Sequence, residues 1–560
     1  MRMTGAQIIV ECLVEAGVDK VFGYPGGQVI PLYDALYCNK DRIKHILTAH
    51  EQGASHAADG YARSSGKVGV CIATSGPGAT NLVTGLATAY MDSVPMVAIT
   101  GNVPVSLLGK DSFQEVDITG VTLPVTKHNV IVKDISELAD TLRKAFKIAK
   151  EGRPGPVLVD IPKNIQTEYY DYEPGVEVSL DRKPNRFRQS DLERAVELIK
   201  TSERPMLYVG GGVIRADASD LLQLFAEIID CPVGSSLMGL GAIPTSSNRF
   251  IGMIGMHGTK LSNLTINSCD LLIVIGARFS DRVISKGSTF AKQARIIQID
   301  VDPAEFNKNI DADIHIISDV KIALQMLVDA LKDFDLDHRK WMNLVEANRI
   351  RYPQKVDTEA KRAKEIIEAL EKVLPENRII TTEVGQHQMW AAQFLKDIKP
   401  RCFLTSGGLG TMGYGTGASI GAQVANPGYR VVNIAGDGSF RMNCNELATI
   451  ARYNLPVIIL VMNNHTLGMV RQWQNLFYEK RYSETTLDTP LDWVMLANAY
   501  GLEGMRLSID DDPEAILKSA VELGCPVVVD CQIPTDDKVL PMVAPGASIS
   551  EMIGFIDKEA

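Results

Sequence analysis

Short apolar runs separated by glycine-rich turns recur along this 560-residue chain. One such run, Val431–Ala435, is followed by a glycine-rich turn, a stretch of helical spacing over 443–452, a breaker containing Pro456 and a second apolar run, Val457–Met462. Runs of this length bounded by breakers are typical of buried strands. The pattern therefore predicts a strand–helix–strand unit with parallel strands.

The same pattern occurs earlier in the chain. The sequence predicts a strand at Val68–Ala73, a turn at Gly76-Pro77-Gly78, a helix from about Thr80 to Met91 and a strand at Met96–Thr100. Gly-Pro-Gly stands here where the later unit has Gly436-Asp437-Gly438. We interpret the two units as an internal duplication in which only one copy carries an acidic residue.

A third alternating segment lies between the two copies, with apolar runs near Met206–Val209, Leu271–Ile275, Ile296–Ile299 and Ile314–Ile317. Strands that alternate with helical patterns predict a parallel, doubly wound sheet. The expected fold is α/β with three doubly wound parallel-sheet domains. We expect domains at 1–180, 190–340 and 360–535, polar linkers at Tyr169–Gln189 and Asp333–Lys364, and an irregular C-terminal arm at 536–560 that acts as a lid.

Composition excludes several classes of function. With 45% apolar and 22% charged residues the chain is typical of a globular protein, and no apolar run approaches the roughly 20 residues that span a bilayer. The net charge of −11 without a Lys/Arg cluster argues against nucleic acid. Thr4 and Gln7 form a capping box for a first helix rather than part of a signal peptide. Nine scattered cysteines without metal-type pairing indicate reduced core residues and a cytoplasmic protein.

Asp437 and Asn464 follow two successive predicted strands. The carboxyl ends of parallel strands meet at one edge of a sheet, so these side chains are expected to lie close together. Mg²⁺ binds carboxylate, amide and phosphate oxygens, and glycines let backbone approach an anion. Gly-Asp-Gly or Asn463-Asn464 alone would more often be an ordinary turn, but together they predict a clamp for Mg²⁺ and a diphosphate.

A triple glycine, Gly210-Gly211-Gly212, follows an apolar run of the middle segment. It fits a phosphate-binding turn and fits a tight strand-to-helix connection equally well. Both interpretations stay open at this point.

These segments, together with His50-Glu51-Gln52-Gly53-Ala54, resemble the thiamine-diphosphate-dependent 2-keto acid enzymes over nearly the whole chain. Within that superfamily, further motifs resemble the catalytic subunits of the acetohydroxyacid synthase (acetolactate synthase) family. These motifs are Phe22-Gly-Tyr-Pro-Gly-Gly27, Thr74-Ser-Gly-Pro-Gly-Ala-Thr-Asn81, Phe113-Gln-Glu, Gly152-Arg-Pro-Gly-Pro, Pro162-Lys163, Gly255-Met-His-Gly258, Gly276-Ala-Arg-Phe-Ser-Asp-Arg282 and Trp473.

The resemblance implies a transferase that decarboxylates pyruvate and joins the two-carbon unit to a second pyruvate or to 2-ketobutyrate. The products would be 2-acetolactate and 2-aceto-2-hydroxybutyrate in branched-chain amino acid biosynthesis. The implied partners are further copies of the chain, in a homodimer or homotetramer with active sites between subunits, and a small regulatory subunit; no membrane or nucleic acid is expected.

The implied cofactors are thiamine diphosphate, Mg²⁺ and a structural FAD. Glu51 would activate thiamine diphosphate through its aminopyrimidine ring, whereas a Glu in this position would otherwise be a solvated surface charge. The implied metal ligands are Asp437, Asn464 and Thr466. The implied thiamine diphosphate contacts are Tyr24, Glu51, Thr74, Pro77, Asn81, Gln386, His387, Gly410, Met412, Asp437, Gly438, Ser439, Asn464, Thr466, Leu467, Gly468 and Met469.

The resemblance assigns Arg282 to the carboxylate of the second substrate, which suits a bidentate guanidinium, and Trp473 to its alkyl group. Without the resemblance they would be a surface ion pair and a core aromatic. The resemblance also implies Phe113 and Met256 as substrate contacts, and Gly27, Gln114 and Lys163 as catalytic residues beside Glu51. The implied FAD contacts are Arg153, Gly210, Gly211, Gly212, Ser236, Leu237, Met256, His257, Gly276, Arg278, Asp300 and Asp319.

The chain departs from the family pattern at two places. Ser280 replaces the usual Asp in a motif that accompanies flavin binding, and Thr416-Gly417 replaces Leu-Pro after Gly-Tyr-Gly. We expect the first to bear on FAD binding and the second to alter the entry to a helix more than the chemistry. Three alternatives remain open: a pyruvate oxidase, a catabolic acetolactate synthase without flavin, and a catalytically inactive nucleotide-binding or regulatory module.

Overall fold

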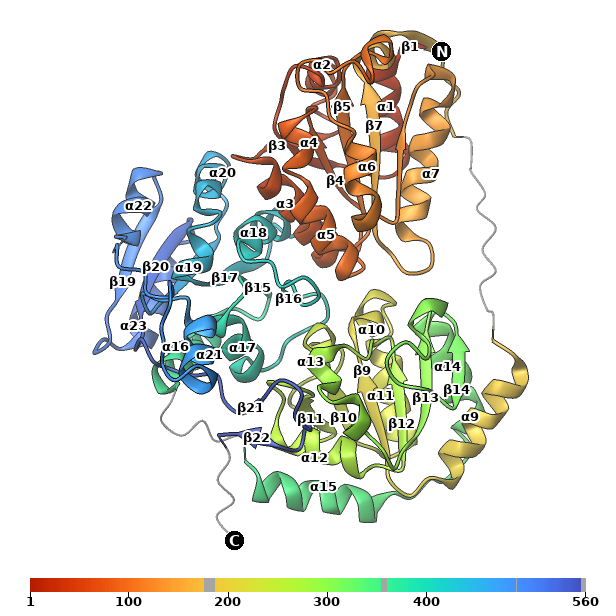
Figure 1. Cartoon of the computed structure of the whole chain (residues 1–560), viewed down its shortest axis with the longest axis vertical. Helices are drawn as coiled ribbons and strands as arrows, with labels where there is room; N and C mark the ends of the chain where they lie inside the picture. The colour runs from red at the N-terminus through yellow and green to blue at the C-terminus, as the bar shows by residue number, and fades with distance from the viewer. Residues whose placement is uncertain (176–186, 354–359, 490, 555–560) are drawn as a thin grey trace.

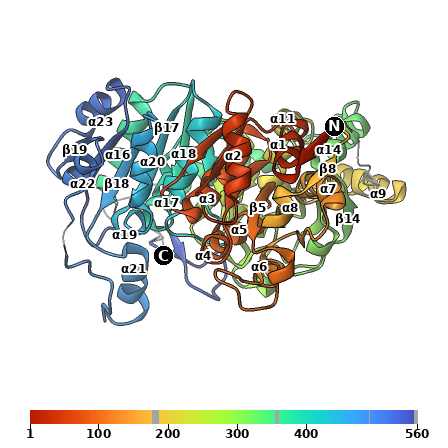
Figure 2. The ribbon, with the colours of Figure 1, turned by 90° about the horizontal axis from the view of Figure 1, so that it is seen from above.

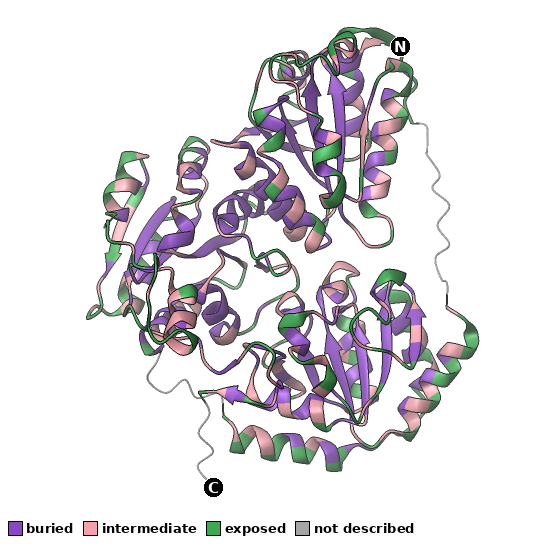
Figure 3. Cartoon of the chain, in the orientation of Figure 1, coloured by how far each residue is buried: buried purple, intermediate pink, exposed green. Residues whose placement is uncertain are grey.

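The computed structural model describes residues 1–175, 187–353, 360–489 and 491–554. Three six-stranded sheets, each flanked by helices, form three lobes (Figure 1). Every strand pair within these sheets is parallel. Parallel sheets carry apolar residues on both faces because crossover helices cover both. Figure 3 shows the strands as buried, with exposed residues mainly on outer helices and loops. The predicted fold class is confirmed.

The N-terminal domain has the strand order β3-β2-β4-β5-β7-β6. Its strands are β2 (Lys20–Gly23), β3 (Lys44–Leu47), β4 (Gly69–Ala73), β5 (Met96–Asn102), β6 (His128–Ile131) and β7 (Pro156–Pro162). Its helices are α1 (Gly5–Glu15), α2 (Ile30–Cys38), α3 (Glu51–Ser65), α4 (Pro77–Thr80), α5 (Val83–Met91), α6 (Ile118–Thr122), α7 (Leu138–Lys150) and α8 (Lys163–Thr167). The capping box of Thr4 and Gln7 opens α1 as predicted.

The central domain has the strand order β11-β10-β9-β12-β13-β14. Its strands are β9 (Pro205–Val209), β10 (Val233–Ser235), β11 (Phe250–Met253), β12 (Leu271–Ile275), β13 (Arg295–Asp300) and β14 (Ile314–Ile317). Its helices are α9 (Gln189–Thr201), α10 (Gly211–Arg215), α11 (Ser219–Ile228), α12 (Lys260–Ser268), α13 (Asp281–Ile284), α14 (Val320–Leu331) and α15 (Arg339–Arg351).

The C-terminal domain has the strand order β16-β15-β17-β18-β20-β19. Its strands are β15 (Arg378–Thr382), β16 (Phe403–Leu404), β17 (Arg430–Gly436), β18 (Ile458–Asn463), β19 (Glu503–Leu507) and β20 (Val527–Gln532). Its helices are α16 (Lys361–Val373), α17 (Gln386–Phe394), α18 (Tyr414–Ala425), α19 (Asp437–Phe440), α20 (Leu447–Arg452), α21 (Gly468–Phe477), α22 (Trp493–Ala499) and α23 (Pro513–Glu522).

The topology bears out the internal duplication. Numbered in chain order, the strands of the N-terminal and C-terminal domains follow the same sequence across the sheet, so β4 and β5 correspond to β17 and β18. The two helices predicted inside the copies are each interrupted. The first is divided into α4 and α5, and the second begins with a 3₁₀ turn at Cys444–Glu446 before α20.

The N-terminal and C-terminal domains pack through α3 and α18, which lie side by side in Figures 1 and 2. Small residues allow this close approach: a Cβ on Gly421 would lie 1.8 Å from the Ala57 carbonyl oxygen, and one on Gly60 2.2 Å from that of Ala418. Gly417 is part of this contact, because its Cβ would lie 2.7 Å from that of His56. The departure at Thr416-Gly417 therefore lies within a tight interdomain contact.

Both predicted linkers contain regular structure, so those predictions are wrong in part. Tyr169–Asp171 forms β8, which pairs antiparallel with β1 (Arg2–Thr4). In the second linker, α15 buries Trp341 and Val345 one turn apart, and the Trp341 indole donates to the Pro205 carbonyl at 2.9 Å. Residues 176–186 and 354–359 of these linkers lie outside the described residues. The helix α15 buries only two residues, which are too few for the sequence pattern to predict a helix there.

The C-terminal arm is less irregular than predicted. Met542–Val543 (β21) and Met552–Ile553 (β22) pair antiparallel, and the Val543 N–H donates to the Met256 carbonyl at 2.8 Å. The arm thus packs on the central domain. Whether it acts as a lid stays a prediction. None of the described helices is both long and apolar enough to cross a membrane. All nine cysteines are free, and five are buried.

Candidate active site

Glu51 begins α3 at the carboxyl edge of the N-terminal sheet. Its side chain is 9% exposed, and its Oε2 accepts a hydrogen bond from Asn81 Nδ2 at 3.0 Å. Two hydrogen bonds fix the backbone just before α3. The N–H groups of Ala49 and His50 donate to the two carboxylate oxygens of Glu446 at 3.1 and 3.0 Å. Glu51 is therefore a buried, held carboxyl group rather than a solvated surface charge.

Three further predicted residues of the N-terminal domain, Thr74, Lys163 and Gly27, lie near Glu51 or contact one another. A Cβ on Gly78 would lie 2.8 Å from Cγ2 of Thr74 and 3.2 Å from Oε1 of Glu51. Lys163 Nζ donates to the Gly27 carbonyl at 3.0 Å. These residues come from the ends of parallel strands, and they gather at one edge of the sheet as the topology requires.

The turn Gly76-Pro77 is backed by Gln114. A Cβ on Gly76, whose φ is +57°, would lie 2.8 Å from the Gln114 carbonyl oxygen, so only glycine fits here. Gln114 itself has a φ of 59°, which is uncommon for a residue with a side chain. Its neighbour Phe113 is 85% exposed and Tyr24 is 43% exposed. Two aromatic side chains predicted to contact ligands thus lie open to solvent in the single chain.

The second cluster lies at the carboxyl edge of the C-terminal sheet, where Asp437 begins α19. Asn464 Nδ2 donates to Gln386 Oε1 at 3.2 Å, and the Thr466 N–H donates to Asn464 Oδ1 at 3.2 Å. Gly436 and Gly468 permit this crowding, because a Cβ on Gly436 would lie 2.6 Å from His387 Nδ1 and one on Gly468 2.0 Å from Gln386 Oε1. Sequence-distant parts of the predicted clamp therefore meet.

Electrostatics at this edge suit a bound cation. Burial raises the pKa of Asp437 to about 7, opposed by the backbone N–H groups of Asp437, Gly438 and Asn464. Burial also lowers the pKa of His387 to about 3, so the ring is neutral, and its Nε2 has no hydrogen-bond partner among the described residues. A divalent cation would favour the ionised Asp437 and offset its desolvation.

The residues fit a hard cation. Asp437 offers a carboxylate, Asn464 an amide oxygen and Thr466 a backbone carbonyl. The Thr466 hydroxyl is buried and has no hydrogen-bond partner within the part of the chain that the structure describes. Oxygen donors of these kinds are the ligands that Mg²⁺ prefers. The described residues contain no group of three or more His, Cys, Asp or Glu side chains that could hold a metal. A site with one carboxylate and two neutral oxygens does not require such a group.

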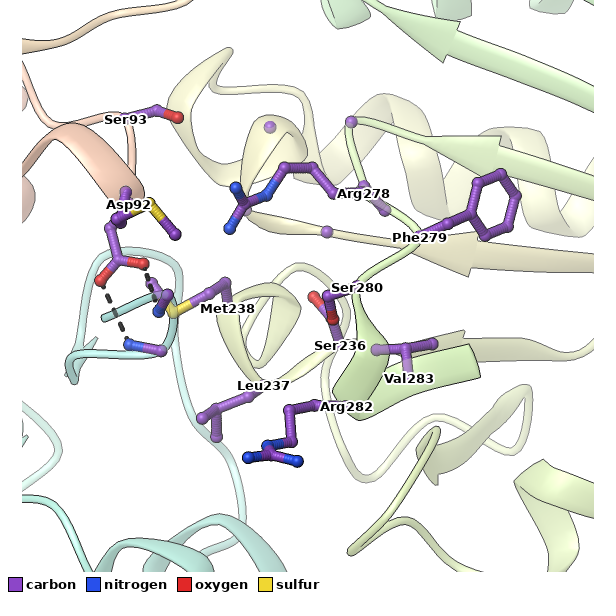
Figure 4. A pocket seen from close by; sticks show the side chains of 18 of the residues that line it. Asp92, Ser93, Ser236, Leu237, Met238, Arg278, Phe279, Ser280, Arg282 and Val283 are labelled. Carbon is purple, nitrogen blue, oxygen red and sulfur yellow. Dashed lines mark hydrogen bonds between the residues drawn. The ribbon is translucent and has the colours of Figure 1, made fainter. Parts of the chain in front are cut away.

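A large cavity of about 970 Å³ opens where the three domains meet. All twelve residues predicted to contact FAD line it, among them Arg153 from the N-terminal domain and Arg278 from the central one. Figure 4 shows Arg278 pointing into this cavity, with Asp92 and Ser93 on the facing side. Arg153 is held by Asp302 at 3.2 Å and by Glu305 at 2.8 Å. The volume and the mixed polar and apolar lining fit a dinucleotide.

Two residues of the triple glycine, Gly210 and Gly212, pack closely against Gly276. A Cβ on Gly210 would lie 2.4 Å from the Gly276 carbonyl oxygen, and one on Gly212 2.6 Å from the Gly276 Cα. These contacts join the end of β9 to the end of β12, so the tight-connection interpretation holds for both residues. All three glycines also line the cavity.

Arg282 and Trp473 line the same cavity although they come from different domains. The Arg282 side chain is 63% exposed, and Asp281 lies 3.5 Å from it. Trp473 packs edge-on against Phe477 with ring centroids 5.7 Å apart. Met256, His257, Gly410 and Met469 are on the same wall. The structure thus places Arg282, Trp473 and Met256 on one cavity with the predicted flavin residues and part of the cofactor set, whereas Phe113 does not line it.

The two clusters at the sheet edges are held by separate sets of hydrogen bonds. Within the described part of the chain, no hydrogen bond links the N-terminal set around Glu51 to the C-terminal set around Asp437. The remaining predicted contacts, Met412, Ser439 and Leu467, belong to the C-terminal set. Ser439 Oγ accepts from the Gly413 N–H at 3.1 Å.

Comparisons with known proteins match each domain. Residues 3–121 match the thiamine pyrophosphate enzyme N-terminal TPP binding domain, residues 192–327 the central domain, and residues 383–531 the C-terminal TPP binding domain. A probable acetolactate synthase large subunit of Methanocaldococcus jannaschii is 47% identical over 98% of this chain and 95% of its own length. The acetolactate synthase isozyme 2 large subunit of Escherichia coli is 47% identical over 98% of this chain and 99% of its own. The chain belongs to the acetolactate synthase large-subunit family of thiamine pyrophosphate enzymes.

Several buried residues of this acetolactate synthase family chain were not found from the sequence. Asp92 lines the cavity and forms an ion pair with Arg63 at 2.9 Å. Its carboxylate accepts hydrogen bonds from the N–H groups of Gly407 and Gly408 at 3.2 and 2.7 Å. Arg63 also pairs with the fully buried Asp59 at 2.6 Å. These contacts hold the loop that contains Gly410. A single sequence carries no signal for them, because an acidic residue on a helix is usually solvated.

Glu383 is a second missed residue, and it explains one departure from the family pattern. Its Oε1 accepts from the N–H and hydroxyl of Thr416 at 2.9 and 3.0 Å, and its Oε2 from the Ser439 hydroxyl at 3.0 Å. Burial raises its pKa. Thr416 therefore supplies two donors to a buried carboxyl group beneath the predicted diphosphate site. The other departure, Ser280, lies on the cavity wall at the start of α13.

Proposed function

We propose that the chain is the catalytic subunit that decarboxylates pyruvate and joins its two-carbon unit to a second 2-keto acid. Pyruvate as acceptor would give 2-acetolactate, and 2-ketobutyrate would give 2-aceto-2-hydroxybutyrate, in valine, leucine and isoleucine biosynthesis. The observation that carries the substrate assignment is that Arg282 and Trp473 lie on the wall of one cavity with Gly410 and Met469. A planar guanidinium suits a carboxylate and an indole suits an alkyl group.

Thiamine diphosphate, when bound, supplies the nucleophilic carbon and the electron sink for loss of CO₂. Glu51 would hold a proton at its carboxyl group against the aminopyrimidine ring, with Asn81 fixing its orientation. Tyr24, Thr74 and Pro77 would border that ring. Gly27, Gln114 and Lys163 would position the reacting carboxylate, and Phe113 and Met256 would exclude water.

Asp437, Asn464 and Thr466 would hold Mg²⁺. Gln386, His387, Gly438, Ser439, Leu467 and Gly468 would surround the diphosphate, and Met412 would support the bent cofactor. Nε2 of the buried His387 has no hydrogen-bond partner in the described ranges, which supports this assignment, because a buried ring nitrogen normally has such a partner.

We further propose that FAD binds in the large cavity and has a structural role, since no step of the reaction is a redox step. The residue set assembled there and the two arginines facing the cavity support a dinucleotide. The same cofactor would serve a pyruvate oxidase, but the acetolactate synthase relatives do not favour that alternative.

The active form would be a homodimer or homotetramer with Glu51 of one chain facing Asp437 of another. Two observations support this arrangement: among the described residues no hydrogen bond joins the two clusters, and Tyr24 and Phe113 are exposed in the single chain. A small regulatory subunit is the further expected partner, since relatives are named large subunits. We expect the protein to be cytoplasmic.

Product analysis tests the proposal. Purified protein with thiamine diphosphate, Mg²⁺, FAD and pyruvate should release CO₂ and form 2-acetolactate. Formation of peroxide or acetyl phosphate without acetolactate would instead support the oxidase. A colourless, flavin-free protein that still forms acetolactate would support the catabolic enzyme.

A further inference from the structure

Two buried Asn–Asp pairs occupy matching places in the duplicated domains. Asn463, the last residue of β18, donates from Nδ2 to Oδ1 of Asp530 on β20 at 2.9 Å. Asn102, the last residue of β5, donates from Nδ2 to Oδ2 of Asp160 on β7 at 2.6 Å. None of the four side chains is more than 3% exposed. Each pair therefore joins two neighbouring strands at the carboxyl edge of its sheet.

The strand register shows that the pairs are equivalent. Asp530 lies opposite Val461, and Asp160 lies opposite Thr100. In both sheets the Asn stands two residues beyond that partner, at the end of the strand. The two strands also occupy the same places in the common strand order. The pair is thus a repeated feature of the duplicated unit and is present in the copy without a predicted metal ligand.

Asn463 controls the turn that follows it. Its Oδ1 accepts from the His465 N–H at 3.3 Å, and its own carbonyl accepts from the Ile533 N–H at 3.0 Å. His465 has a φ of 57°, a left-handed conformation that a residue with a side chain adopts only where its surroundings impose it. On either side of His465 stand Asn464 and Thr466. The side chain of Asn463 thereby links Asp530 to the centre of this turn.

The twin pair acts on a different segment. Asn102 Oδ1 accepts from the adjacent Val103 N–H at 2.8 Å. Val103 leads into a loop that contains none of the predicted metal ligands. The Asn–Asp pair therefore fixes the turn between two predicted metal ligands in the C-terminal domain and a loop without metal ligands in the N-terminal domain.

We propose that Asn463 and Asp530 are positioning residues for Mg²⁺: they fix the turn at Asn464–Thr466 so that its amide and carbonyl oxygens converge with Asp437. Asp530 in turn is held by Arg506, whose Nε lies 3.3 Å from Oδ2. Outer residues that orient metal ligands typically contribute 10-fold to 100-fold to metal affinity. This inference rests on the metal site proposed above.

The test measures binding directly. Thiamine diphosphate is titrated into the full-length protein by isothermal calorimetry over a series of Mg²⁺ concentrations, which gives the Mg²⁺ concentration for half-maximal cofactor binding. For Asn463→Ala we expect this concentration to rise at least about tenfold. For the matched variant Asn102→Ala we expect a change below about twofold, because its pair does not reach the metal turn.

An exchange of the two side chains provides the rescue. Asn463→Asp alone places two buried carboxylates together and should weaken Mg²⁺ binding. The double variant Asn463→Asp/Asp530→Asn reverses donor and acceptor, keeps the net charge, and leaves one oxygen each for Arg506 and the His465 N–H. It should return the half-maximal Mg²⁺ concentration to within about threefold of the original.

Two results would overturn the inference. One is unchanged Mg²⁺ dependence in Asn463→Ala; the other is an equal effect of Asn102→Ala. If Asn463→Ala does not fold, the proposal is tested by comparing the Mg²⁺ dependence of the double variant with that of Asn463→Asp alone. A double variant that binds Mg²⁺ no better than Asn463→Asp would contradict the proposal. Asp437→Asn, measured in the same titration, distinguishes the metal site from the positioning role. Unchanged Mg²⁺ dependence in Asp437→Asn would refute the metal site itself. A changed dependence in Asp437→Asn together with an unchanged one in Asn463→Ala would refute only the positioning role.

Discussion

Asn81 donates from Nδ2 to Oε2 of Glu51 at 3.0 Å, at the point where α4 ends. The predicted helix from Thr80 to Met91 is interrupted here, and the interruption leaves the Asn81 side chain free to reach Glu51. The amide donor fixes the orientation of the Glu51 carboxyl group, and the proposed contact with the aminopyrimidine ring requires a fixed orientation.

We expect Glu51→Gln to lower the rate of acetolactate formation by about 100-fold or more, the usual range for a lost acid–base group. The amide keeps the volume and the contact with Asn81 but cannot exchange a proton in the same way. The measurement is kcat with pyruvate, with cofactor binding checked by calorimetry. A rate equal to that of the unsubstituted protein would remove Glu51 from the mechanism.

Active sites shared between chains predict complementation. Glu51→Gln and Asp437→Asn should each be nearly inactive, whereas mixed dimers contain one site with neither substitution. Random pairing of equal amounts should therefore restore about a quarter of the original activity, because half of the dimers are mixed and half of their sites are intact. If each site lies within one chain, mixing restores nothing.

Arg282 lies 3.5 Å from Asp281, and its side chain is largely exposed. We therefore expect Arg282→Ala to cost little stability but to raise the KM for the acceptor keto acid by about 10-fold to 100-fold through loss of a charge-assisted pair. Arg295→Ala, at an exposed pair with Asp313, is the control. Equal effects of both substitutions on KM would argue against a carboxylate site at Arg282.

The flavin assignment predicts that purified protein is yellow and that Arg278→Ala lowers its FAD content, as measured by visible absorbance after denaturation. Arg278 points into the cavity (Figure 4). Ser280→Asp, which restores the common family residue on the cavity wall, should increase FAD retention during gel filtration. No loss of flavin in Arg278→Ala would place the dinucleotide elsewhere.

His56 gives a prediction for acid stability. Burial, with a smaller effect of Arg63, lowers its pKa from an ordinary value of 6.5 to about 3. Between these values the unfolded chain binds the proton and the folded chain does not, so stability falls as pH falls from about 6.5 toward 3. The contribution between pH 6.5 and 5 is about 1 to 2 kcal/mol per chain.

His56→Gln removes this titration. Its thermal midpoint should therefore decline less between pH 6.5 and 5 than that of the original protein, as measured by differential scanning calorimetry at one scan rate. Identical declines would mean that the pKa of His56 is not lowered in the folded protein.

The sequence predicted the elements that repeat and missed those that depend on tertiary contact. Leu271–Ile275, for example, is a fully buried strand, and its continuous apolar run is visible in the sequence. The helix α15 and the strand β8 could not be predicted from the sequence. The helix buries only Trp341 and Val345, and the strand is a short exposed edge paired with β1.

The site divides in the same way. Asp437 and Asn464 were recognisable because glycines and strand ends mark them. Glu383, Glu446 and Asp530 are equally buried, but each becomes meaningful only through a partner far along the chain, such as Thr416 for Glu383. No local pattern encodes such a pairing.

The central claim is that this chain joins two keto acids rather than oxidising one. The most direct measurement incubates the purified protein with pyruvate and 2-ketobutyrate together, with and without added FAD, and quantifies all products. We expect CO₂ with 2-acetolactate and 2-aceto-2-hydroxybutyrate, and the loss of these products in Glu51→Gln. Peroxide or acetyl phosphate in place of both hydroxyacids would contradict it.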